Sequence, residues 1–179
     1  SAIDDIRSWI RNGGTLVAIK DAVSWARANN LAKVNFKSDG REQEGRRAYT
    51  MLSPDRGSDR IGGSIMQAEI DLSHPLFFGY QSETLPVFQR GTLAFTPSQN
   101  AYATPAVYAE EPLLSGYARP EHLDKLSGAA VALVSGSGRG KTICLSVDPN
   151  FRAFWYGTNR LFANSIFFGS TISGSAVER

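Results

Sequence analysis

Hydrophobic positions near the start of the chain change from a helical to a strand spacing within twenty residues. Ile3, Ile6, Trp9 and Ile10 recur every three or four positions, which predicts a helix that Gly13-Gly14 would end. The next run, 15–19 (TLVAI), is apolar on both faces and is typical of a buried strand in a parallel sheet. Asp21 can then cap a helix extending to Ala28. Helix, strand and helix joined by tight turns indicate an α/β fold.

The second half of the chain alternates short apolar runs with turn-rich sequence. Pro86, Pro97 and Pro105 flank two of the predicted strands, which favours positions at sheet edges for both. The glycines at 136, 138 and 140 lie between two apolar runs and predict a hairpin. The predicted strands are 64–71, 85–88, 106–109, 129–134 and 142–147, and the predicted helices are 120–126 and 158–168.

A long polar stretch interrupts this pattern. Residues 37–63 are rich in Gly, Arg and Asp, contain Pro54, and carry no periodic apolar positions. We expect a long surface loop here, inserted in an otherwise single domain of residues 1–179. Its arginines could meet an acidic partner or remain solvated.

Composition narrows the class of protein. The 179 residues are 42% hydrophobic and 20% charged, which excludes a disordered chain, and no run approaches the roughly 18 apolar residues of a membrane span. Nineteen basic against seventeen acidic residues leave a net charge of +2, too small to bind nucleic acid or anionic lipid through charge alone. A single cysteine excludes an intramolecular disulfide.

Three motifs that can carry chemistry fit structural roles better. The segment 136–142 (GSGRGKT) ends like a phosphate-binding loop but has Ser135 where that motif needs its first glycine, and a strand follows it. His74 and His122 have no carboxylate at metal-ligand spacing, so no metal site is expected in this chain. Cys144 lies within an apolar strand, where cysteine usually packs as a small hydrophobe.

The ends of the predicted strands are the remaining place for a site, because α/β folds place ligands there. One hypothesis is a stand-alone enzyme using Lys20, Asp21, Asp148 and Arg152, since a buried lysine can become a base or a nucleophile. Another is a sugar- or peptide-binding module built on the aromatic segment 151–156, where Trp155 would contact the ligand. A structural role for these aromatics, sealing the last helix against the sheet, is the simpler interpretation.

Three segments together resemble a known family: WIRNGGTLVAIKDA, SHPLFFGY and the stretch from LLSGYARPEHL to NRLFANSIF. They are similar to the class I glutamine amidotransferase-like domain at the C-terminus of certain bacterial zinc carboxypeptidase-family proteins. The resemblance covers most of the chain outside the polar stretch. It implies a three-layer, flavodoxin-like α/β fold.

The same resemblance bears on catalysis. Active amidotransferases carry a G-x-C-x-G nucleophile elbow after this strand, and the alignment places Ala18, Lys20 and Ala22 at its first glycine, cysteine and second glycine. Because lysine has no thiolate to attack an amide, the resemblance implies a non-catalytic accessory domain. Zinc and the peptidase residues would belong to an upstream domain of the same polypeptide, which is expected to be periplasmic or secreted. This accessory domain would stabilise the catalytic domain or help to present peptide or cell-wall substrates.

The family's domain also begins with βα units that precede the first helix here. We therefore expect a chain trimmed at its N-terminus, with a strand edge left exposed. An exposed edge can pair with another chain, so the sequence also predicts possible homo-oligomers.

Overall fold

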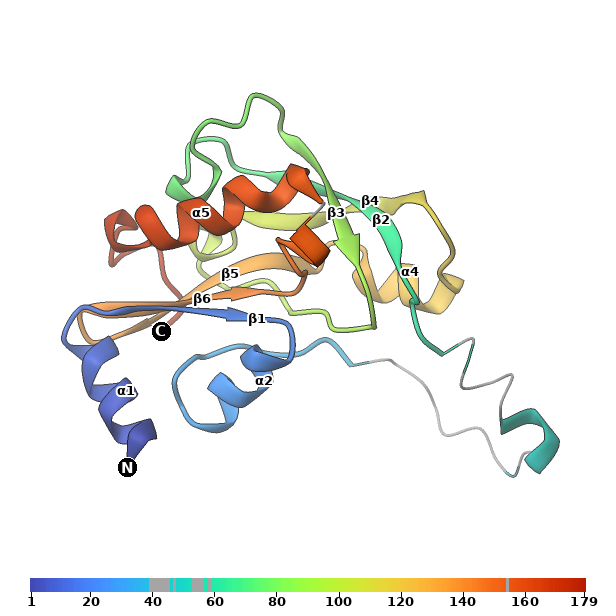
Figure 1. Ribbon diagram of the computed structural model, residues 1–179, viewed down its shortest axis with the longest axis horizontal. Helices are drawn as coiled ribbons and strands as arrows, with labels where there is room; N and C mark the ends of the chain where they lie inside the picture. The colour runs from blue at the N-terminus through green and yellow to red at the C-terminus, as the bar shows by residue number, and fades with distance from the viewer. Residues whose placement is uncertain (39–45, 47, 53–56, 58, 154) are drawn as a thin grey trace.

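The computed structural model describes residues 1–38, 46, 48–52, 57, 59–153 and 155–179 (Figure 1). Much of the predicted loop 37–63 lies outside the described residues. The α-helices are α1 (Ala2–Arg11), α2 (Asp21–Ala28), α4 (Pro120–Leu126) and α5 (Asn159–Phe167), and the strands are β1 (Thr15–Ile19), β2 (Ser64–Ile70), β3 (Thr84–Gln89), β4 (Ala106–Ser115), β5 (Ala130–Ser137) and β6 (Gly140–Leu145). Short 3₁₀ turns connect them, among them η2 (Pro75–Phe77) and η4 (Phe151–Ala153).

The strands form one curled, six-stranded mixed sheet in the order β1-β6-β5-β4-β2-β3. β1 runs parallel to β6, and the other neighbouring pairs are antiparallel. The predicted α/β class is confirmed, and so is the hairpin, formed by β5 and β6. The prediction of edge positions holds for β3 but is wrong for β4, which lies between β2 and β5. Register shifts in the β2–β4 ladder accommodate the irregular course of β4 past Pro112.

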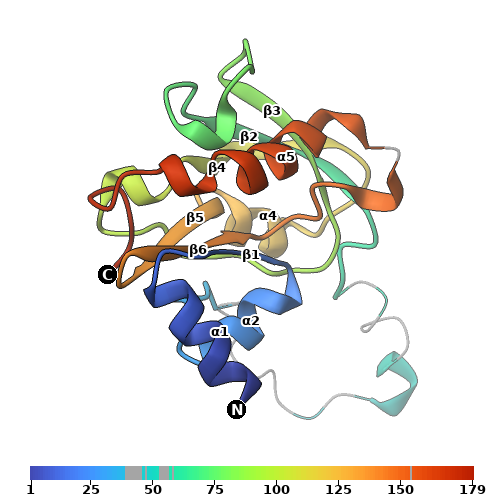
Figure 2. The same ribbon diagram turned by 60° about the vertical axis from the view of Figure 1, so that its left-hand side comes forward.

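Helices cover both faces of the sheet. Figure 2 shows α5 on one side of β1, β5 and β6, with α1 and α2 on the other. Because side chains alternate along a strand, β6 serves both cores: Ile143 and Leu145 pack with α5, and Cys144 packs with α1 and α2. Cys144 is fully buried, as predicted, and burial raises the pKa of its thiol to about 12. No helix among the described residues has the length and apolar character needed to cross a membrane.

The first helix and the hairpin contact each other through bare backbone. α1 begins with a capping box between Ser1 and Asp4, and Gly13 has the positive φ of 117° that turns the chain into β1. A Cβ on Gly140 would lie only 2.0 Å from the Ile10 carbonyl oxygen. The glycine-rich turn is therefore a packing feature. Its two basic residues differ, since Arg139 is exposed while Lys141 is buried and donates to the Ile172 carbonyl.

His74 has a structural role at the start of η2. Its Nδ1 accepts a hydrogen bond from the Leu76 N–H at 3.2 Å, so the side chain orders the backbone of this turn. The side chain is buried, and among the described residues its Nε2 has no hydrogen-bond partner. Burial lowers the pKa of His74 from 6.5 to about 4.

The lowered pKa makes stability depend on pH. Between pH 6.5 and about 4 the unfolded chain binds a proton at His74 that the folded chain does not. The free energy of unfolding should therefore be highest above pH 6.5 and fall by up to about 3 kcal/mol as the pH approaches 4. Urea unfolding at the two ends of this range measures the loss. His74→Asn keeps an acceptor for the Leu76 N–H and should lose less stability; an equal loss in both proteins would contradict the assignment.

The two edges of the sheet differ. The edge strand β3 contains Pro86, which lacks an N–H and hinders further strand pairing, whereas β1 contains neither proline nor charge. Lys20 and Lys141 donate their N–H groups to Leu145 and Gly14, which fixes the side of β1 that faces β6. Because backbone groups alternate along a strand, the N–H of Val17 points to the open edge.

We therefore expect concentration-dependent self-association through β1. Size-exclusion chromatography with light scattering measures it. Val17→Pro should weaken association because it removes an N–H from the open edge, while the control Val17→Thr keeps that N–H. A monomer at every concentration, or equal association of the two variants, would contradict edge pairing.

Candidate functional site at the end of β1

The chain bends sharply between β1 and α2. Lys20 alone forms this bend, and its backbone angles of φ 55° and ψ −122° are rarely adopted by residues other than glycine. Hydrogen bonds hold it on both sides: the Lys20 N–H donates to the Leu145 carbonyl, and the Lys20 carbonyl accepts from the Val23 N–H, each at 2.9 Å. The strand-to-helix bend therefore has the strained backbone of a nucleophile elbow, with a lysine at its tip.

The prediction that Asp21 caps α2 is wrong. Asp21 is the first helical residue, and Lys20 occupies the cap position without a side-chain cap hydrogen bond. The positive φ of Lys20 explains the difference, because helix caps normally have extended backbone. The aspartate carboxylate still lies in the first turn, where the helix dipole favours it.

The Lys20 side chain lies at the edge of a cavity of about 710 Å³. Its Nζ donates to the carbonyl oxygen of Arg90, which follows β3. Partial burial lowers the pKa of the Lys20 ammonium, and the nearby carboxylates of Asp21 and Asp148 oppose this shift. The Arg90 carbonyl thus holds the Lys20 amine at the wall of the cavity, and the carboxylates of Asp21 and Asp148 are close enough to act on its charge.

The cavity unites residues from distant parts of the sequence. Three of the predicted site residues line it, namely Lys20, Asp21 and Asp148. Sequence reasoning did not assign the other three charged residues of its wall to a site: Arg60, Arg90 and Lys125. Arg90 directly follows β3, and Lys125 lies in the short helix α4. No spacing in the sequence connects either residue with Lys20. Arg60 lies in the predicted loop 37–63, whose arginines the sequence left either to meet an acidic partner or to remain solvated.

Arg152 and Trp155, the other predicted site residues, do not line this cavity. The guanidinium of Arg152 lies 5.4 Å from the centroid of the Phe151 ring, which stacks on Phe88 at 4.0 Å. Trp155 approaches Phe88 from another side, with ring centroids 6.5 Å apart. Phe151 and Trp155 thus contact the sheet through Phe88 of β3, whereas Tyr156 is exposed and Phe154 lies outside the described residues. Phe88 and Phe151 nevertheless supply one wall of the cavity.

The described residues contain no group of three or more His, Cys, Asp and Glu side chains that could hold a metal ion. The described residues of the cavity wall include no histidine or cysteine, and their ionisable side chains are ammonium, guanidinium and carboxylate groups.

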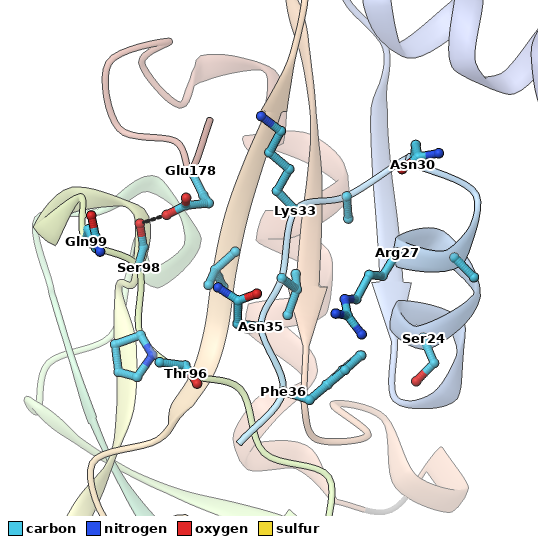
Figure 3. A pocket seen from close by; sticks show the side chains of 15 residues that line it. Ser24, Arg27, Asn30, Lys33, Asn35, Phe36, Thr96, Ser98, Gln99 and Glu178 are labelled. Carbon is cyan, nitrogen blue, oxygen red and sulfur yellow. Dashed lines mark hydrogen bonds between the residues drawn. The ribbon is translucent and has the colours of Figure 1, made fainter. Parts of the chain in front are cut away.

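A second hollow, of about 810 Å³, lies on the α2 side of the sheet (Figure 3). Two contacts within it engage charged side chains. The Ser98 hydroxyl donates to Glu178, and the Arg27 guanidinium lies 5.2 Å from the centroid of the Phe36 ring. None of the predicted site residues lines this hollow, so the bend at Lys20 is the better candidate site.

Comparison with known proteins gives only distant similarity. No protein-family model matches the sequence, and no curated protein matches it. Among solved structures, the cytoplasmic protein STM3548 from Salmonella typhimurium is similar over 93% of this chain and 59% of its own, with a TM-score of 0.45 and 16% identity. A cold-adapted β-galactosidase from Rahnella sp. R3 is similar over 94% of this chain and 20% of its own, with a TM-score of 0.36 and 14% identity. The chain thus spans about three fifths of the Salmonella protein and a fifth of the β-galactosidase.

The strain at Lys20 can be measured by exchange for glycine. Lys20→Gly should raise the free energy of unfolding by about 1 kcal/mol relative to Lys20→Ala, because glycine adopts positive φ freely while alanine keeps the strain. Both variants lose the amine and its bond to Arg90, so the difference between them isolates the backbone. Denaturant unfolding of both proteins measures it, and equal stabilities would show that the bend is unstrained.

Proposed function

We propose that this chain is a non-catalytic accessory domain of a zinc carboxypeptidase-family protein. In this proposal the domain is a flavodoxin-like, class I glutamine amidotransferase-like domain whose nucleophile position is occupied by lysine. The observation that carries it is the strained β1–α2 bend with Lys20 at its tip. The link to a carboxypeptidase comes from the sequence resemblance.

The chemistry of the bend supports a non-catalytic role. Amide hydrolysis by an elbow residue needs a nucleophile with a base that accepts its proton. The Lys20 amine donates to the Arg90 carbonyl, and the cavity wall offers carboxylates but no imidazole. The bend keeps the backbone of a catalytic turn and uses it to place a cation at the end of the sheet.

The accessory role assigns the hydrolytic chemistry to another part of the polypeptide. Zinc would be held by an upstream peptidase domain, as the sequence resemblance implies. This domain would then stabilise the peptidase or help to present peptide or cell-wall substrates to it. The open edge of β1 and the exposed Trp9 and Trp25 side chains of α1 and α2 give it a surface that another domain could cover.

The native polypeptide tests the proposal. An antibody raised against this chain should detect a band far above 19.5 kDa in immunoblots of source-cell fractions. Mass spectrometry of the immunoprecipitated band should find peptides of a zinc peptidase domain upstream of Ser1. A native product of 19.5 kDa, or a longer product with an unrelated upstream domain, would overturn the assignment.

A further inference from the structure

We propose that the cavity beside Lys20 binds a ligand with two carboxylate groups, either a small dicarboxylate or the acidic C-terminal end of a peptide. The proposed role is binding without catalysis, and it does not depend on whether the chain is joined to a peptidase. The charged side chains of the cavity wall are the first observation that points to it.

Charge in the cavity wall is strongly unbalanced. Among the described residues of the wall, four are basic, namely Lys20, Arg60, Arg90 and Lys125, and two are acidic, namely Asp21 and Asp148. This excess of basic side chains favours an anionic ligand over a neutral or cationic one.

The two arginines are available to such an anion. Among the described residues, neither Arg60 nor Arg90 has a side-chain hydrogen bond or an ion pair, and both are exposed at the cavity. By contrast, Arg119, the residue that precedes α4, pairs with Asp59 at 3.2 Å. A guanidinium presents two parallel N–H groups that match the oxygens of a carboxylate. Two such groups facing one cavity fit two carboxylates.

Lys20 adds a third cation whose position is fixed. Its Nζ uses one of three N–H groups on the Arg90 carbonyl, which joins the lysine to the backbone next to an arginine of the wall. The charges of Asp21 and Asp148 act on the ammonium, but among the described residues neither carboxylate forms an ion pair with it within 4.0 Å. The remaining N–H groups of Lys20 can therefore donate to a ligand oxygen.

The rest of the cavity suits the carbon skeleton between two carboxylates. The stacked rings of Phe88 and Phe151 form an apolar wall, and Ile61 and Leu93 extend it. A volume of about 710 Å³ lies within the usual range for small-molecule sites. A short aliphatic chain would pack on this wall while its ends reach the cations.

Titration of the isotopically labelled chain followed by amide NMR tests the proposal. Glutarate and the peptide acetyl-Gly-Glu serve as the two carboxylate probes, and the diamide glutaramide is the uncharged control. Glutarate should bind saturably, shift the amides of Lys20, Gly62 and Gly91, and bind less tightly as salt is added. If acetyl-Gly-Glu binds more tightly than glutarate, the ligand is a peptide end; the reverse order indicates a free dicarboxylate.

Matched variants show whether the effect belongs to the cavity. Arg90→Gln should weaken glutarate binding by about tenfold, through loss of a charge-assisted contact. Arg11→Gln removes the same charge at the last turn of α1, at the opposite end of β1, and should leave binding unchanged. Absence of saturation at about 10 mM glutarate would overturn the proposal. So would equal binding of glutaramide or inorganic phosphate, or equal weakening by the two variants.

Discussion

The fold depends on the pairing of β1 with β6. β6 is buried along its whole length and joins the antiparallel strands of the sheet to β1, with which it runs parallel. The Lys20 N–H completes this pairing by donating to the Leu145 carbonyl, while α2 must start at the next residue to cover the sheet. One residue has to satisfy both demands, and it does so with a positive φ. The pairing of β1 with β6 and the immediate start of α2 thus determine both where the Lys20 side chain lies and why its backbone is strained.

That constraint determines what the site can do. A side chain at the tip of a sharp strand-to-helix bend projects beyond the end of the sheet. Here the projected group is a cation, and β3, α4 and the segment around Arg60 bring further cations to the same cavity. This grouping of cations at the bend is the basis for proposing a binding role.

Local pattern was enough to predict most elements but not how they pair. The helices α1, α2, α4 and α5 and the β5–β6 hairpin follow from apolar periodicity and turn residues, which act over a few positions. The sequence placed β4 at an edge of the sheet because prolines lie near it in the sequence, and proline is typical of edge strands. The prediction was wrong because the neighbours of a strand are determined by segments that are distant in the sequence. For the site, Lys20, Asp21 and Asp148 were found because they follow apolar strands directly. Arg90 and Lys125 were missed because only the folded sheet brings them to the bend.

Ammonia release from glutamine by the purified chain is the most direct test of the claim that Lys20 fills a nucleophile position without serving as one. The wild-type chain and Lys20→Met would be assayed together, with the fold of each checked by circular dichroism. We predict that both release no more ammonia than buffer alone. Glutamine-dependent release by the wild-type chain that Lys20→Met abolishes would contradict this account, because it would make the bend a working active site.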